Sequence, residues 1–177
     1  MPEYKATLMD SSAVERALKR ISHEIVERNN GCENLCVIGI KRKGVPLAEM
    51  IASNIGKIEN AEVKTGVLDI TFYRDDIVAN ESPVIGESQI DFDITGKTVV
   101  LVDDVLCTGR TVRAAMEALN RHGRAAAIQL AVLIDRGHRE LPIRGDYVGK
   151  NVPTSKHERV SVKLPPFDEI ISVELYG

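Results

Sequence analysis

The sequence predicts an α/β domain built on a central, mostly parallel sheet. Short apolar runs of strand length alternate with segments of helical periodicity along most of the chain. Polar loops follow the apolar runs, as expected where parallel strands end at the ligand-binding edge of such a sheet. A length of 177 residues fits one domain of ordinary size, so we expect residues 1–177 to fold as a single domain.

Composition and charge exclude several classes of protein. A formal net charge of −3 argues against a protein that coats nucleic acid through bulk charge, although a local basic face remains possible. The longest largely apolar run, residues 125–134, is far shorter than the ~20 residues that span a membrane, and the first residues do not resemble a signal peptide. Cys32, Cys36 and Cys107 fit neither a disulfide framework nor a zinc site, so we expect free thiols in the cytoplasm.

The first half of the chain predicts helix, strand, helix and strand. Helical spacing from Val14 to Ile25 puts apolar side chains on one face, with Ser12 and Glu15 as a capping box and residues 29–31, NNG, as the end. The apolar run 35–40 is typical of a buried strand, and a helix over 45–55 follows with a proline in its first turn. Residues 63–72 predict the next strand.

The second half repeats this alternation after a long polar stretch. Residues 74–96 contain proline and glycines and predict either a lid over a site or a plain exposed hairpin. A strand over 98–102, a helix over 112–122 and a strand over 126–134 come next. Shorter strands are expected over 147–152 and 160–164, and the segment 170–175 closes the chain.

One motif, VVLVDDVLCTGRT at residues 99–111, carries most of the chemistry. Asp103 and Asp104 follow four apolar residues, at the end of a strand. Residues 107–111 then lead into a helix N-terminus, which offers unpaired N–H groups and a positive dipole to an anion. The loop favours an anion, whereas the two aspartates would repel one. A sugar phosphate satisfies both, because its hydroxyls donate hydrogen bonds to the carboxylates while its phosphate binds to the loop. The motif therefore predicts a ribose 5-phosphate site rather than an ordinary turn with exposed acids.

The basic loop at residues 41–44, KRKG, lies between the first buried strand and the following helix. Basic side chains and a glycine in this position can hold a second anion.

These two motifs resemble a known family. VVLVDDVLCTGRT resembles the phosphoribosyl pyrophosphate (PRPP) signature of type I phosphoribosyltransferases, and GIKRKGVPLA at residues 39–48 resembles their pyrophosphate loop. The resemblance implies the type I phosphoribosyltransferase fold, a central mostly parallel sheet flanked by helices with a flexible flap and a small hood. The loop departs from the common K-T-R-G pattern, and Cys107 stands where relatives often carry an aromatic or other residue.

Three further stretches narrow the resemblance. LDITFYRDD at 68–76, residues 129–155 and RISHEIVERN at 20–29 resemble the bifunctional regulators that attenuate pyrimidine operons and act as uracil phosphoribosyltransferases. This implies transfer of ribose 5-phosphate from PRPP to uracil, giving UMP and pyrophosphate, with Mg²⁺. It also implies UMP-dependent binding of pyr leader mRNA and a homo-oligomer, a dimer or larger. The PRPP signature alone leaves open a phosphoribosyltransferase for another base with no RNA-binding role.

The resemblance also assigns site residues. The catalytic set is Asp103 and Asp104 at the ribose hydroxyls, with Arg42 and Lys43 at pyrophosphate. The substrate-binding set is Lys41, Gly44, Val105, Leu106, Cys107, Thr108, Gly109, Arg110 and Thr111, with Ile134, Asp135 and Arg136 at the base. The flap set is Tyr73, Arg74, Asp75 and Asp76. No side chain is assigned as a direct metal ligand, because Mg²⁺ is expected to bind through PRPP and water near Asp103 and Asp104.

A group of basic residues is the candidate RNA-binding set. Any one of these side chains alone is most simply a solvated surface charge. The resemblance favours RNA contact for Arg20, His23, His138, Arg139, Arg144 and Lys150. Because only 4% of the residues are aromatic, arginine and histidine planes would have to supply the stacking surfaces that RNA recognition uses.

Overall fold

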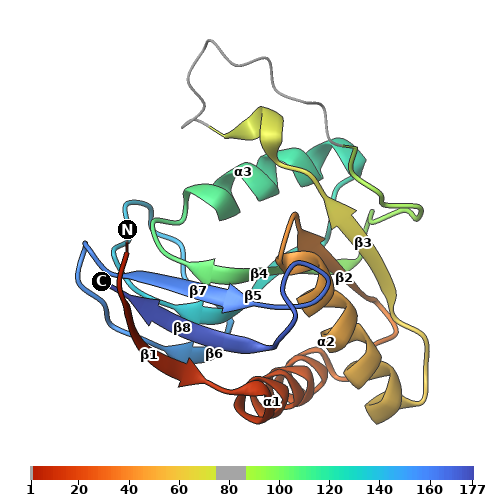
Figure 1. Ribbon diagram of the computed structural model, residues 1–177. Helices are drawn as coiled ribbons and strands as arrows, with labels where there is room; N and C mark the ends of the chain where they lie inside the picture. The colour runs from red at the N-terminus through yellow and green to blue at the C-terminus, as the bar shows by residue number, and fades with distance from the viewer. Residues whose placement is uncertain (1, 75–86) are drawn as a thin grey trace.

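The computed structural model, which describes residues 2–74 and 87–177, contains two sheets (Figure 1). The larger sheet has five parallel strands in the order β3-β2-β4-β5-β6. Its strands are β2 (Leu35–Ile40), β3 (Lys64–Leu68), β4 (Thr98–Leu106), β5 (Ala127–Asp135) and β6 (Tyr147–Asn151). The predicted α/β class and mostly parallel sheet are confirmed.

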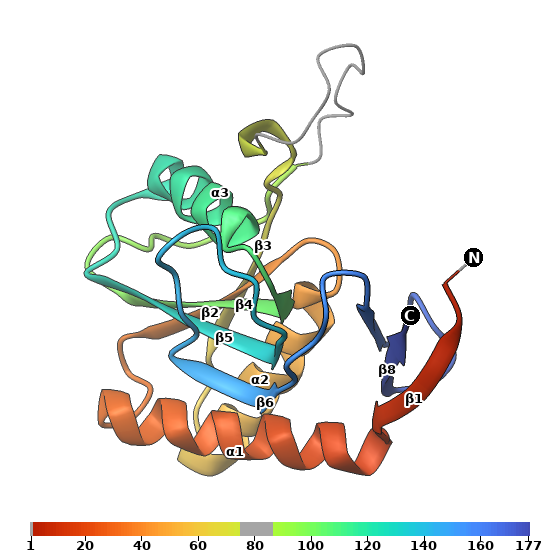
Figure 2. The ribbon, with the colours of Figure 1, turned by 90° about the vertical axis from the view of Figure 1, so that its left-hand side faces the viewer.

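The smaller sheet is antiparallel and forms a hood over the main sheet. It consists of β1 (Tyr4–Met9), β7 (Arg159–Lys163) and β8 (Ser172–Tyr176), in the order β1-β8-β7. Figure 2 shows these strands beyond the arrowheads of β4, β5 and β6. The hood therefore faces the carboxyl ends of the parallel strands, where ligands of α/β sheets bind.

Helices cover both faces of the main sheet. Helices α1 (Ser11–Asn29) and α2 (Gly44–Glu59) lie on one face and α3 (Arg110–Leu119) on the other (Figure 1). Alternate residues of β4 divide between the two cores, because successive side chains of a strand point to opposite faces. Val100 and Val102 pack with the α1 and α2 side, while Val99 and Leu101 pack with the α3 side.

The start of α1 differs from the predicted capping box. Asp10, not Ser12, is the N-cap residue, and its Oδ1 accepts the Ala13 N–H at 2.8 Å. Strand β1 ends at Met9, so the chain turns into the helix directly after it. Sequence reasoning found no strand in this N-terminal segment and therefore placed the cap too late.

The bounds of three other elements also differ from the prediction. Strand β3 ends at Leu68, because the Asp69 carboxylate accepts both the Thr71 N–H, at 2.9 Å, and its hydroxyl and so bends the chain into a 3₁₀ turn over Thr71–Tyr73. Helix α2 continues to Glu59 instead of 55. Helix α3 begins at Arg110 and ends at Leu119, followed by a second 3₁₀ turn over Asn120–His122.

Strand β4 is longer than predicted, and this positions the site. Its pairing with β2 ends at Gly39 opposite Val102, but its pairing with β5 continues to Leu106 opposite Asp135. The acids predicted to follow the strand thus lie inside it, beside the space that β2 leaves. The connection from β2 runs outward to β3 and the one from β4 runs to β5, so this space is the topological switch point of the sheet.

The predicted lid or hairpin over residues 74–96 lies largely outside the described residues, which end at 74 and resume at 87. Within the described part, Val67 and Gln89 form an antiparallel bridge with both backbone hydrogen bonds, at 2.8 and 2.9 Å. In residues 2–74 and 87–177, no helix is long and apolar enough to cross a membrane.

Asp10→Ala should lower the free energy of unfolding by about 1 kcal/mol, because it removes the oxygen that caps the Ala13 N–H. The matched control is Ser12→Ala, which removes only a surface hydrogen bond from Arg16 and should change stability by less than about 0.5 kcal/mol. Urea denaturation of both variants measures the difference. Equal losses would argue against Asp10 as the cap.

Candidate active site

A cavity of about 970 Å³ lies at the switch point, between the main sheet and the hood. It brings together much of the set assigned from sequence, namely Lys41, Arg42, Lys43, Arg74, Asp103, Asp104, Val105 and Thr111. Asp75 and Asp76, assigned to the flap, lie outside the described residues. The predicted acids and the predicted basic loop therefore share one cavity.

The two acids differ in their surroundings. Asp103 is only 8% exposed, and its Oδ1 accepts the Asp104 N–H at 2.9 Å, while Asp104 accepts the Val105 N–H at 2.9 Å. Burial, together with the charge of Asp104, raises the pKa of Asp103 well above its usual value. This pair of carboxylates favours a ligand that donates hydrogen bonds to it.

The basic loop is held against β4 by direct backbone contact. A Cβ on Gly44 would lie 2.3 Å from the Val102 carbonyl oxygen, and one on Gly39 would lie 2.5 Å from the Cα of Val45. Only glycine allows such an approach at either position. The glycines of GIKRKG thus bring residues 41–43 to the edge of the acid pair.

All three basic side chains of this loop have acidic or aromatic partners. Lys43 pairs with Asp168 at 3.1 Å and also donates to the Val162 carbonyl, so it is tied to the hood. The Arg42 guanidinium lies over the Phe167 ring, 4.9 Å from its centroid. Lys41 approaches Asp69, the residue after β3, at 3.5 Å.

These partners keep two of the cavity carboxyls charged. The Leu164 N–H and the Lys43 ammonium hold the pKa of Asp168 below its usual value. Burial acts to raise the pKa of Asp69, but hydrogen bonds from Thr71 and the charge of Lys41 outweigh it and lower that pKa. The cavity therefore combines fixed charges of both signs with the raised pKa of Asp103.

The phosphate loop, residues 107–111, ends at the N-terminus of α3. Gly109 adopts a φ of +92° and is the N-cap residue, and the Thr108 hydroxyl accepts the Arg110 N–H at 3.2 Å. The first turn of a helix presents N–H groups that have no partner within the helix and can bind an anion, although the Arg110 N–H already has the Thr108 hydroxyl as its acceptor. The loop therefore ends in a helix N-terminus as predicted, and anion binding there stays a prediction.

The residues assigned to the base lie at the end of β5. Ile134 is buried and paired on both sides. The Asp135 carboxylate binds Arg139, and the Arg136 guanidinium donates to Thr154 at 3.1 Å and to the Glu158 carbonyl at 2.7 Å. Asp135 and Arg136 line a separate hollow of about 450 Å³. Because both side chains are engaged by the protein, base recognition at this point would fall to the backbone.

Basic residues from α1 and β6 form one surface. Arg20 donates to the Val148 and Gly149 carbonyls, at 3.3 and 2.6 Å, directly beside Lys150, which donates to the Leu8 carbonyl at 3.1 Å. His23 is exposed on the same helix. Three of the six residues assigned to RNA thus gather where α1 crosses β6.

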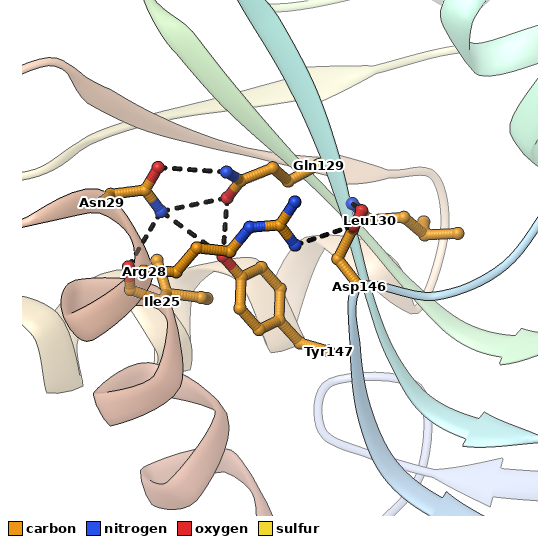
Figure 3. Close-up of polar contacts among 7 residues, drawn as sticks. All are labelled: Ile25, Arg28, Asn29, Gln129, Leu130, Asp146 and Tyr147. Carbon is orange, nitrogen blue, oxygen red and sulfur yellow. Dashed lines mark hydrogen bonds and ion pairs between the residues drawn. The ribbon is translucent and has the colours of Figure 1, made fainter.

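A polar network joins the C-terminal end of α1 to the sheet (Figure 3). The Asn29 and Gln129 side-chain amides exchange two hydrogen bonds of 3.0 Å, and the Tyr147 hydroxyl donates to Gln129 at 2.7 Å. Arg28 pairs with Asp146 at 2.8 Å, and Asp146 also accepts the Leu130 N–H at 2.8 Å. This network fixes the helix on the edge of the sheet.

The network also includes Arg28, a basic residue of α1 that is not in the predicted RNA-binding set. Arg28 and the exposed Arg144 line one hollow of about 480 Å³. The Arg139 side chain is 25% exposed, about half as much as those of Arg20 and Arg28, at 48% and 50%, and its guanidinium binds Asp135 and the Cys107 carbonyl. Its RNA contact, like the rest of that set, stays a prediction.

The cavity has further lining residues that sequence reasoning did not find, Asp69, Ile70, Thr71, Arg159, Phe167 and Asp168. Asp69 had a signal, since it directly follows a strand that ends at the same edge as β4. Phe167 and Asp168 had none, because only the folding of the hood brings them to the basic loop.

Comparison with known proteins gives one consistent result. The family model for the phosphoribosyl transferase domain matches residues 6–166. A bifunctional protein PyrR from Deinococcus radiodurans is 59% identical over 97% of this chain and 94% of its own length. Another, from Acetivibrio thermocellus, is 60% identical over 97% of this chain and 94% of its own length.

Solved structures agree on the fold. A hypoxanthine phosphoribosyltransferase from Staphylococcus aureus superposes with a TM-score of 0.74 at 17% identity, covering 99% of this chain and 94% of that one. The Trypanosoma cruzi hypoxanthine phosphoribosyl transferase gives a TM-score of 0.76 at 17% identity, covering 99% and 92%. At this identity the likeness shows the fold alone.

Asp103→Asn should stabilise the ligand-free protein increasingly as the pH rises. A carboxyl with a raised pKa contributes stability below its unfolded pKa of about 3.9, and this contribution is lost as the pH rises toward the folded pKa. The variant therefore gains on the parent protein between pH 5 and 8, by at most about 1.4 kcal/mol per pH unit. Urea denaturation at several pH values measures the gain.

Asp168→Asn is the contrast of opposite sign. Because its pKa is lowered by the Leu164 N–H and by Lys43, this carboxyl stabilises the fold above about pH 4 and loses that effect as the pH falls. The variant should be less stable than the parent at neutral pH, with a deficit that shrinks only in acid.

For Asp103→Asn, a difference in unfolding free energy from the parent protein that stays constant from pH 5 to 8 would contradict the raised pKa of Asp103.

Proposed function

The chain belongs to the phosphoribosyl transferase family and, within it, to the bifunctional PyrR proteins, and from this premise we propose two linked activities. The first is transfer of ribose 5-phosphate from PRPP to uracil, and the second is binding of pyr leader mRNA with UMP as the sensed nucleotide. The carrying observation is one cavity that holds an acid pair beside a basic loop, in a chain so similar to these relatives.

The transfer requires little covalent chemistry from the protein. The C1′–O bond to pyrophosphate breaks, the bond from uracil N1 to C1′ forms, and the N1 proton passes to solvent. Positive charge develops on the ribose, and Asp103 and Asp104 stabilise it while accepting hydrogen bonds from the ribose hydroxyls. Residues 107–111 hold the 5-phosphate, and residues 41–43 bind the departing pyrophosphate.

We propose Mg²⁺ as the cofactor, bound through PRPP and water near the acid pair. The donors that line the cavity fit this ion, since Asp69, Asp103, Asp104 and Asp168 all offer hard carboxylate oxygens. Among the residues the structure describes, no three side chains of His, Cys, Asp or Glu group as a metal cage, so the substrate and water would complete the coordination. When bound, Mg²⁺ neutralises charge on the pyrophosphate.

The RNA-binding surface is supported by the way its arginines are held. Arg20 is fixed to the Gly149 carbonyl and Lys150 to the Leu8 carbonyl, and Arg28 and Arg144 line one hollow. Basic groups fixed in this way lose little side-chain entropy on binding phosphates. A dimer or larger assembly would extend this surface, and we place both activities in the cytoplasm, where nascent mRNA and PRPP occur together.

The second candidate function is that of a phosphoribosyltransferase for another base. No observation on this chain favours it, because the hypoxanthine enzymes share the fold at 17% identity while the PyrR relatives share 59% and 60%.

Changing both acids, Asp103→Asn with Asp104→Asn, should reduce conversion of uracil and PRPP to UMP by on the order of a hundredfold or more. Turnover is measured by release of UMP, and hypoxanthine replaces uracil in a parallel assay that should show no product. The control is Asp91→Asn, which neutralises an exposed acid outside the cavity and should keep normal turnover. Turnover near that of the parent protein in the double variant would remove the acids from the mechanism.

Labelled pyr leader RNA should bind more tightly when UMP is present. Lys150→Gln should weaken this binding and reduce the salt dependence of log Kd by about one, because one phosphate contact is lost. Lys57→Gln, an exposed lysine on α2, is the matched control and should change neither quantity. If RNA binding by the parent protein did not depend on UMP, the proposed regulatory activity would be refuted and only the enzymatic activity would stand.

A further inference from the structure

The segment 135–143, which follows β5, lies directly on the phosphate loop. Backbone amides of this segment donate to carbonyls of the chain just before and within that loop. These contacts are the Arg136 N–H to the Leu106 carbonyl, and the Glu140 and Leu141 N–H groups to the Thr108 carbonyl, all at 3.0 Å. A side-chain pair adds to them, since Arg110 and Glu140 approach to 2.7 Å.

Arg139 closes this contact with a fork of hydrogen bonds. Its Nη1 and Nη2 groups donate to the two oxygens of Asp135 at 2.9 and 2.5 Å, and Nη1 also donates to the Cys107 carbonyl at 2.9 Å. Its Nε donates to the Ile143 carbonyl at 2.6 Å. The Asp135 side chain is only 13% exposed, so this is a shielded, bidentate pair.

The backbone that returns Arg139 to Asp135 is held in an uncommon conformation. Gly137 and His138 have φ values of +78° and +64°, both in the left-handed region. Asp135 accepts the Gly137 N–H at 3.0 Å, and a ring nitrogen of His138 bonds to the Thr154 carbonyl at 2.6 Å. These contacts hold the reversal, so the segment has little freedom to move apart from its anchor.

The phosphate loop and the segment share peptide groups. The peptide unit whose carbonyl accepts from Arg139 also carries the Thr108 N–H, and the next unit, whose carbonyl accepts from Glu140 and Leu141, carries the Gly109 N–H. An anion bound to these N–H groups polarises the same peptide units and strengthens the bonds that their carbonyls accept. The segment 135–143, which these bonds hold against the phosphate loop, carries His138 and leads to Arg144.

We propose that Arg139 is a positioning residue that couples the occupant of the phosphate loop to the surface that binds RNA. This rests on the proposed function, since it explains how UMP in the cavity affects RNA outside it. Coupling between two sites is reciprocal, so RNA must tighten UMP by the same factor by which UMP tightens RNA. Arg139 acts through the loop, and its loss removes this factor.

The test is the ratio of Kd values for a labelled pyr leader transcript without and with saturating UMP. The ratio should fall toward one in Arg139→Lys, which keeps the charge but cannot form the fork to Asp135 and Cys107. Asp135→Asn, which breaks the pair from its other side, should lower the ratio as well. Titration of UMP with and without RNA should show the same loss from the other direction.

Arg20→Lys is the matched control, the same change at an exposed arginine of α1 that lies outside the segment 135–143. A residue that only contacts RNA changes both Kd values by one factor and preserves the ratio. A preserved ratio in Arg139→Lys, with parent-like UMP affinity, would therefore overturn the coupling role and assign Arg139 to direct contact. The parent protein is measured first. If its own ratio of Kd values without and with UMP is one, the UMP-dependent function itself is refuted.

Discussion

The close contact between Gly44 and the Val102 carbonyl determines the shape of the whole active-site edge. There is no room for a Cβ between these two backbones, and the contact falls where β2 stops and β4 continues. The basic loop is therefore pressed beside a strand whose next two residues are acids. If the start of α2 lay farther from β4, by the width of one side-chain atom, the basic loop would be separated from the acid pair. A ligand with both hydroxyls and phosphates could then not reach both groups together.

The charges at this edge are stabilised unequally. Asp69 and Asp168 have cationic and amide partners, and their pKa values are lowered, whereas Asp103 is buried beside another acid and its pKa is raised. The carboxyl with the least favourable surroundings is the one assigned to the substrate. Sites that are organised for a ligand commonly cost stability in its absence, and here the cost falls on one identifiable group.

The parallel sheet was predictable because its strands are continuous apolar runs buried on both faces, such as residues 35–40 and 127–135. The hood was harder to predict, since β1 is largely exposed and lacks such a run. The acids and the basic loop that line one cavity could be predicted together because chemistry and local turn geometry coincide in the sequence. Phe167 and Asp168 could not be found, because their place beside Arg42 and Lys43 depends on packing between segments more than 120 residues apart in the chain.

Strand ends show the same division between local and long-range information. The predicted end of β4 was too early because a pair of acids reads as a loop, yet pairing with β5 carries the strand on to Leu106. The start of α1 was wrong for a similar reason, since the cap depends on where β1 ends. In both places a neighbouring strand, absent from the local pattern, determines the boundary.

The ion pair between Lys43 and Asp168 has a consequence for how tightly substrate binds. Lys43 is assigned to pyrophosphate, yet in the ligand-free protein its ammonium is already held by a hood carboxylate and by the Val162 carbonyl. Under the proposed function, PRPP would displace these partners, so part of its intrinsic binding energy would go into that exchange. The hood would thereby lower the affinity for PRPP in the ground state.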